Sequence, residues 1–120
     1  MSDIEKNHKV YVGIGSNINQ KLHINKCIRA LESKFIDIEL SPTYESSSMG
    51  FDGPNFYNLV ASFTTDLEID ILKETLKNIE MDNGRSFGEV KFSSRTLDID
   101  ILYYDDLIDE KINIPRCEII

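Results

Sequence analysis

Two aspartates lie two positions apart in the apolar run Leu97-Asp98-Ile99-Asp100-Ile101. If this run is a β-strand, both carboxylates point to the same face of the sheet, because side chains alternate along a strand. Carboxylate oxygens are ligands that Mg²⁺ accepts when substrate phosphates complete its coordination shell. The pair therefore predicts a metal site for phosphate chemistry, although an ordinary solvated strand face could have the same spacing.

Basic residues gather just before this pair. Between Arg85 and Arg95 the sequence has three cations, at Arg85, Lys91 and Arg95, and one acid, at Glu89. Arg95 lies three residues before Asp98, where its guanidinium could clamp phosphate oxygens beside a metal. The segment therefore predicts a cationic loop over a small polyanionic ligand, and the alternative is a solvated loop without function.

A second candidate group lies near the middle of the chain. The polar segment from Ser46 to Gly53 leads into Phe56-Tyr57-Asn58. If this is the start of a strand, Phe56 and Asn58 lie on one face. An aromatic ring and a side-chain amide suit a flat heterocycle, through stacking and paired hydrogen bonds, although Phe56 could equally belong to the core.

The glycines near the N-terminus do not form a complete nucleotide-binding motif. Gly13-Ile14-Gly15 begins like a dinucleotide fingerprint but lacks the third glycine, and no G-x-x-x-x-G-K-[ST] sequence occurs. We therefore expect a strand over residues 10–14 that ends in a tight turn at Gly15-Ser16-Asn17.

Composition limits the classes of function. The chain has 120 residues and a formal net charge of -8, which predicts one domain over residues 1–120 whose surface repels nucleic acid and anionic lipid. No stretch approaches the roughly 20 apolar residues of a membrane span, and the polar start of the chain lacks the features of a signal peptide. We expect a cytoplasmic protein that binds neither nucleic acid nor membrane.

Hydrophobic spacing predicts the elements that position these groups. Besides the first strand, we expect a helix over 20–35, strands over 36–44, 56–65 and 97–104, and a short segment over 111–114 as a candidate partner of the last strand. A second helix is expected between a cap at Thr65 or Asp66 and a stop at Gly84. Cys27 should lie in the core, and His8 and His23 at the surface. The order βαββαβ predicts a ferredoxin-like α+β fold, a mostly antiparallel sheet with both helices on one face.

The chain resembles the 6-hydroxymethyl-7,8-dihydropterin pyrophosphokinase family of folate biosynthesis. The resemblance runs from about Val10 to Pro115 and rests on Gly15-Ser16-Asn17, Tyr44, Phe56-Tyr57-Asn58, Glu80-x-x-x-Gly84-Arg85 and Arg95-Thr96-Leu97-Asp98-Ile99-Asp100-Ile101-Leu102. It implies transfer of diphosphate from ATP to the hydroxymethyl group of a reduced pterin, with release of AMP. It further implies two Mg²⁺ ions, ATP as co-substrate and a monomeric enzyme.

The resemblance also implies roles for individual residues. Asp98 and Asp100 match metal ligands, and Arg85 and Arg95 match arginines that act on the triphosphate or its product. Positions that contact the nucleotide or close over the ligands are matched by Glu80, Lys91, Phe92, Ile101, Lys111, Asn113 and Arg116. Pterin-binding positions are matched by Ser46, Ser47, Met49, Phe56 and Asn58.

The chain departs from the family pattern in several places. Ser46-Ser47-Ser48 stands where Thr-Pro-Pro is common, and Phe92 stands where a tryptophan often closes over the ligands. We also expect the C-terminal segment of the family to be missing after Ile120. Two alternatives to an active kinase are a noncatalytic nucleotide- or pterin-binding module of the same fold and a ferredoxin-like interaction domain.

Overall fold

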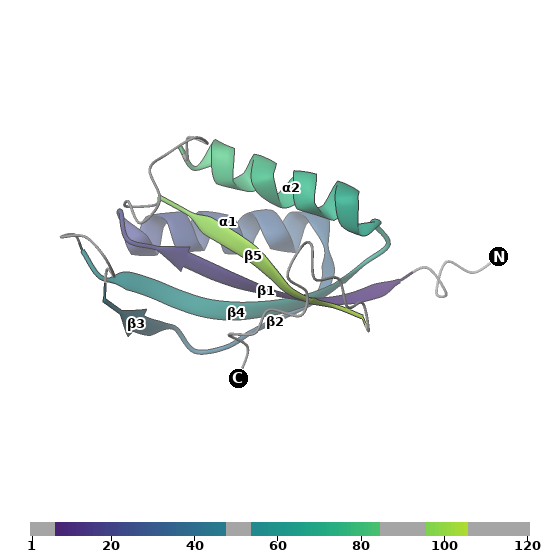
Figure 1. The fold of residues 1–120 in the computed structure, drawn as a ribbon, viewed down its shortest axis with the longest axis horizontal. Helices are drawn as coiled ribbons and strands as arrows, with labels where there is room; N and C mark the ends of the chain where they lie inside the picture. The colour runs from purple at the N-terminus through teal and green to yellow at the C-terminus, as the bar shows by residue number, and fades with distance from the viewer. Residues whose placement is uncertain (1–6, 48–53, 85–95, 106–120) are drawn as a thin grey trace.

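Two helices lie on one face of an antiparallel sheet in the computed structural model of the chain, which describes residues 7–47, 54–84 and 96–105 (Figure 1). The elements in chain order are β1 (His8–Ser16), α1 (Gln20–Lys34), β2 (Ile36–Leu40), β3 (Tyr44–Ser46), β4 (Phe56–Thr65), α2 (Ile69–Asp82) and β5 (Asp98–Tyr104). This order confirms the predicted α+β fold of ferredoxin-like type. The segment expected at 111–114 lies outside the described residues.

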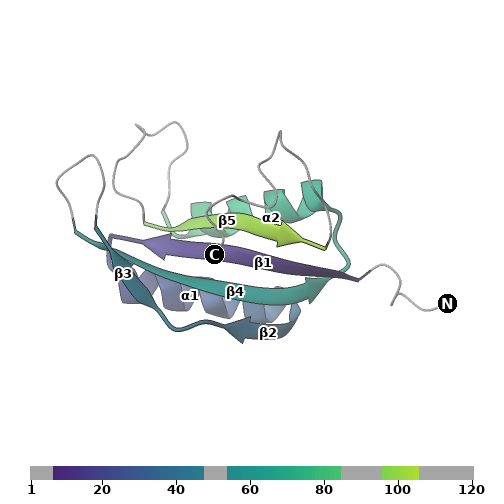
Figure 2. The ribbon, with the colours of Figure 1, turned by 60° about the horizontal axis from the view of Figure 1, so that its bottom comes forward.

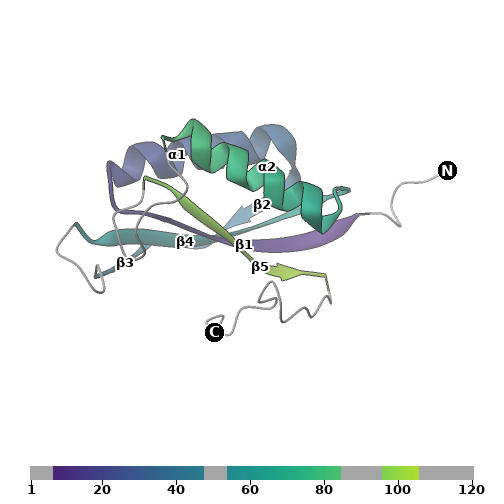
Figure 3. The same ribbon diagram turned by 45° about the horizontal axis from the view of Figure 1, so that its top comes forward.

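The strand order is β2-β4-β1-β5, and β3 pairs with β4 beyond the end of β2. Every pairing is antiparallel. Figure 2 looks onto the face of the sheet that neither α1 nor α2 covers, and we call it the open face. Figure 3 shows both helices on the opposite side. At one end of the open face, the end of β1 lies between the beginnings of β4 and β5.

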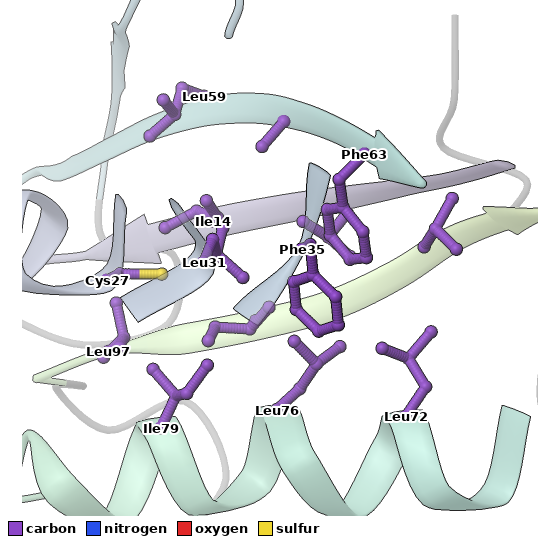
Figure 4. Close-up of a cluster of buried hydrophobic side chains, with 14 of the residues drawn as sticks. Ile14, Cys27, Leu31, Phe35, Leu59, Phe63, Leu72, Leu76, Ile79 and Leu97 are labelled. Carbon is purple, nitrogen blue, oxygen red and sulfur yellow. The ribbon is translucent and has the colours of Figure 1, made fainter. Parts of the chain in front are cut away.

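The core fills the space between the sheet and the helices (Figure 4). Alternate residues of the strands point into it, and α1 and α2 contribute residues three and four positions apart, which lie on one side of a helix. Phe35 and Phe63 stack with their ring centroids 4.2 Å apart. Cys27 is fully buried, as predicted. The sheet residues in this cluster include Val10, Val12, Ile14, Leu59, Ala61, Phe63 and Ile99, and the helix residues include Leu31, Leu72, Leu76 and Ile79.

Two strand boundaries differ from the prediction. β1 continues through Gly15 to Ser16 instead of turning at Gly15, because both of its edges are paired at this point, with β4 and with β5. The strand expected over 36–44 is divided into β2 and β3. Between them, Ser41 uses its side chain as well as its backbone to bond Val60, and Pro42 has no N–H to donate.

The predicted start of the second helix is also wrong. Glu68 is the residue that caps α2, and it makes no side-chain capping bond. The Thr65 hydroxyl accepts a hydrogen bond from the Leu67 N–H at 3.1 Å, within the turn before the helix. Gly84 does end the helix as expected, since it adopts φ 84° and its N–H donates to Met81 O.

Neither histidine is an ordinary surface residue. His23 is buried, and its Nδ1 lies 2.6 Å from Ile18 O in the turn before α1. His8 stacks on Tyr104, and its Nδ1 lies 2.6 Å from Asp105 Oδ2. The surface prediction failed for His8 because its partners, Tyr104 and Asp105, are distant in sequence, and for His23 because its ring folds back onto the turn before α1. Among the described residues, no helix is both long enough and apolar enough to cross a membrane.

Candidate active site

The two candidate metal ligands lie at the beginning of β5. Ile99 between them is only 7% exposed and belongs to the core, so the side chains of Asp98 and Asp100 are directed to the open face. Both aspartates are half-buried. Positions two apart on a strand are separated by about 6.5 to 7 Å, which allows both carboxylates to approach phosphate-bound cations.

The sheet register brings the two predicted sites together. Gly15 of β1 pairs with Asn58 of β4 on one side and with Asp98 of β5 on the other. Directly paired residues point to the same face, and two strand spacings separate Asn58 from Asp98 by about 10 Å between backbones. Since Gly15 has no side chain, only the backbone of β1 lies between the amide and the carboxylate.

The neighbouring row repeats this arrangement. Gly13 pairs with Val60 on β4 and with Asp100 on β5. A Cβ placed on Gly13 would lie 3.5 Å from Leu102 Cδ1, an ordinary contact distance. In these two rows each aspartate is therefore paired across the sheet with a glycine, and β1 contributes no side chain.

Asn58 is oriented by its neighbours. Its Nδ2 donates to Ser46 Oγ at 2.9 Å and to Phe56 O at 3.4 Å. Because a peptide carbonyl can only accept, the amide nitrogen must face Phe56 O. The Oδ1 atom then faces β1, 3.1 Å from where a Cβ of Gly15 would lie. The hydrogen bonds leave Asn58 with an acceptor directed over Gly15.

The turn after β1 holds the beginning of β4. Asn17 is fully buried, and its Nδ2 donates to Pro54 O at 3.1 Å. Gln20 Nε2 donates to Asn55 O at 2.9 Å, and Asn55 Nδ2 donates to Glu45 Oε2 at 3.1 Å. These bonds connect Asn17 in the turn and Gln20 at the start of α1 to the two residues that precede Phe56. The turn therefore fixes the position at which β4, with Phe56 and Asn58, begins.

Glu80 lies near the end of α2 and is 5% exposed. Its Oε2 accepts a hydrogen bond from the Ile99 N–H at 2.7 Å. Burial, together with the negative charge of Glu80, raises the pKa of the Cys27 thiol to about 12. The carboxylate predicted to line a nucleotide site is thus bonded to the backbone between Asp98 and Asp100.

The other predicted residues are distributed unevenly. Ile101 is partly buried and packs against the core, and Ser47 follows β3 as an exposed residue. Their predicted ligand contacts remain predictions. The candidates that fall outside the described residues are Met49, Arg85, Lys91, Phe92, Arg95, Lys111, Asn113 and Arg116.

Among the residues that the structure describes, no group of three or more His, Cys, Asp or Glu side chains could hold a metal ion. Within those residues, Asp98 and Asp100 offer a pair of carboxylates. Mg²⁺ is commonly bound through one or two carboxylates, with substrate phosphates and water as its remaining ligands. The donor set fits a cation that arrives with a phosphorylated substrate.

Three residues that shape this region were not assigned to the site from the sequence. Gly13 was predicted within the strand over 10–14, and Gly15 and Asn17 within the turn after it. Gly15 and Asn17 also contributed to the family resemblance, but no role at the site was assigned to them. Two glycines in alternate positions of a β-branched run were the available signal, because they predict a strand face without side chains. No comparable signal identified Asn17, whose partner Pro54 is remote in sequence.

Fold and geometry define a ferredoxin-like α+β domain with a carboxylate pair and an amide on its open sheet face. Residues 11–120 match the family model described as 7,8-dihydro-6-hydroxymethylpterin-pyrophosphokinase. The chain belongs to this family.

Relatives with this activity in their names include 2-amino-4-hydroxy-6-hydroxymethyldihydropteridine pyrophosphokinases from three bacteria. The Aquifex aeolicus protein is 40% identical over 100 residues, which cover 81% of this chain and 61% of the relative. The Pseudomonas aeruginosa protein is 32% identical, with 92% of this chain and 68% of the relative covered. The Haemophilus influenzae protein is 34% identical, with 88% and 69% covered. The chain thus spans roughly two thirds of these relatives or slightly less.

Proposed function

We propose that this protein transfers diphosphate from ATP to the hydroxymethyl group of 6-hydroxymethyl-7,8-dihydropterin and releases AMP, with Mg²⁺ required. The observation that carries the proposal is the register that aligns Asn58, Gly15 and Asp98 across three strands. It allows a heterocycle held by Asn58 and a phosphate group held near Asp98 to meet over the backbone of β1. Family membership supports the same reaction.

On the acceptor side, the proposal assigns recognition of the pterin to Phe56 and Asn58. The Phe56 ring lies beside β1, with Cδ1 3.8 Å from where a Cβ of Gly15 would lie, and it is proposed to stack on the pterin. Asn58 Oδ1 is proposed to accept a hydrogen bond from a ring N–H. Ser46 holds the amide in the required orientation through its hydroxyl.

On the donor side, Asp98 and Asp100 are proposed to hold two Mg²⁺ ions that arrive with ATP. When bound, Mg²⁺ neutralises charge on the phosphate oxygens and positions them for displacement. Arg85 and Arg95 are proposed to bind the triphosphate or its product, which is the role that the family resemblance implies. Catalysis would then consist of positioning and charge stabilisation, without a covalent enzyme intermediate.

The remaining expectations from the sequence also enter as proposals. Lys91, Phe92, Lys111, Asn113 and Arg116 are proposed to contact the nucleotide or close over it. A monomeric state and a cytoplasmic location are proposed on the basis of the family and the acidic composition.

The test is AMP formation from ATP, with and without the pterin alcohol and Mg²⁺. We expect AMP only when both are present, and a decrease of about 100-fold or more for Asp98→Ala, as when one preorganised electrostatic group is removed from other active sites. Asp70→Ala is the matched control, because it removes an exposed carboxylate from the first turn of α2. No AMP under any condition would contradict the proposal, and binding of an ATP analogue would then favour the noncatalytic module.

A further inference from the structure

Glu80 is the one buried acid among the described residues, at 5% exposure. Burial of a carboxylate costs free energy unless hydrogen bonds or charges compensate for the lost hydration. The position of this side chain must therefore be stabilised by specific partners. Its bond to β5 identifies one of them and indicates what the carboxylate does.

That partner is the peptide group between the two candidate metal ligands. Glu80 Oε2 accepts from the Ile99 N–H at 2.7 Å, a length typical of a bond to a charged group. The same peptide group joins Asp98 to Ile99. β5 is the last strand in the described sheet order, so β1 pairs with only one of its two edges. Glu80 bonds the Ile99 N–H at the other edge of β5.

We propose that Glu80 is a positioning residue for the metal site. Its bond to the Ile99 N–H fixes the backbone between Asp98 and Asp100, and so sets the separation and direction of the two carboxylates that receive Mg²⁺. The inference rests on the proposed function, which supplies the metal. It differs from the nucleotide contact implied by the family resemblance, because the carboxylate acts through the backbone of β5.

Two substitutions separate the acceptor oxygen from the rest of the side chain. Glu80→Gln keeps an oxygen that can accept from Ile99, and Glu80→Leu removes it while retaining a side chain of similar volume. With Mn²⁺ as the probe, a cation that also prefers oxygen ligands, binding is measured by electron paramagnetic resonance in the presence of a nonhydrolysable ATP analogue. We expect Glu80→Leu to weaken Mn²⁺ binding by about tenfold or more, and Glu80→Gln by much less.

A second readout reports the backbone directly. Amide hydrogen exchange at Ile99, relative to Val12 in β1, is expected to accelerate selectively in Glu80→Leu. Leu76→Ala is the matched control on the same helix, because it removes core contacts without removing the acceptor. It should accelerate both amides together and leave Mn²⁺ affinity near the wild-type value.

The outcomes distinguish the inference from the proposed function. If Glu80→Leu binds Mn²⁺ as the wild type does, the positioning role is wrong, whether or not AMP is formed. Equal losses in Glu80→Gln and Glu80→Leu would also overturn it, as would a wild-type protein that binds no Mn²⁺. If the wild type forms no AMP but Mn²⁺ binding falls selectively in Glu80→Leu, the inference stands and the proposed reaction is wrong.

Discussion

The absence of a side chain at Gly15 leads to the sharpest prediction about this site. In Gly15→Ala, the new Cβ would lie 3.1 Å from Asn58 Oδ1 and 3.8 Å from Phe56 Cδ1. Gly15 is not among the residues with positive φ, so the backbone itself tolerates alanine. The first contact is too short by a few tenths of an ångström, and the Asn58 amide must move to relieve it.

The size of the effect follows from what holds that amide. Moving it weakens the 2.9 Å bond to Ser46 Oγ, and a neutral hydrogen bond contributes about 0.5–1.5 kcal/mol. Replacing a strand glycine with alanine returns about 0.5–1 kcal/mol of conformational entropy. The free energy of unfolding should therefore change by less than about 1 kcal/mol. A weakened Asn58 bond to the pterin corresponds to a rise of about two- to twelvefold in the pterin KM.

Steady-state AMP formation and urea denaturation test this reasoning, with Gly13→Ala as the comparison. The alanine at position 13 would meet Leu102 at 3.5 Å, an ordinary contact, so it should stabilise the fold slightly and leave the pterin KM unchanged. The ATP KM should stay near the wild-type value in both variants. An unchanged pterin KM in Gly15→Ala, or an equal rise in Gly13→Ala, would refute the proposed contact between Asn58 and the pterin.

Three further predictions concern the surrounding fold. Asn17→Ala should destabilise the protein by about 0.5–1.5 kcal/mol in urea denaturation, because it removes the hydrogen bond from the buried Asn17 Nδ2 to Pro54 O, and a loss close to zero would contradict this. Leu76→Ala should cost about 2–5 kcal/mol, since it removes a fully packed core side chain, and a markedly smaller shift in the urea midpoint would count against that packing. The pKa of Cys27 is raised from 9.0 to about 12, chiefly by burial, so its contribution to stability is complete below pH 9.0 and is lost as the pH rises towards about 12. Denaturation at pH 8 and above pH 10 should show a smaller alkaline decrease in Cys27→Ala than in the wild type, and identical decreases would refute the assignment.

The sequence predicted the elements well where hydrophobic spacing is regular. The strand over 56–65 matches β4, and the helix expected over 20–35 matches α1 to within one residue. Both segments place apolar residues on one face throughout, so local pattern and tertiary packing agree. The division of 36–44 into β2 and β3 was missed because it depends on pairing with β4. Leu40 pairs with Ala61 and Tyr44 with Asn58. Between these two pairs, three residues of the β2–β3 segment (41–43) lie opposite only two residues of β4 (59–60).

Capping and burial of polar residues were predicted less well, for a related reason. Thr65 and Asp66 are both suitable helix caps by type, but α2 begins later and Glu68 occupies the capping position. The partners of His8 and Glu80, which are the Asp105 carboxylate and the Ile99 N–H, lie on or beside β5, so their positions depend on the completed fold. Residue type indicates that such a group needs a partner, and only the three-dimensional arrangement shows which one it has.

The candidate site depends on register, which local spacing does not specify. The Asp-x-Asp and Phe-x-Asn patterns each predicted a pair of side chains on one strand face, but they lie on β5 and β4, which do not pair with each other. β1 lies between them, and only its register aligns Asn58, Gly15 and Asp98. A one-residue shift of β1 would place Ile14 or Ser16 opposite these side chains and direct a side chain between them. Gly15 thus serves the site because it leaves only backbone between Asn58 and Asp98, and this glycine, which was predicted to lie in a turn, lies within a paired strand.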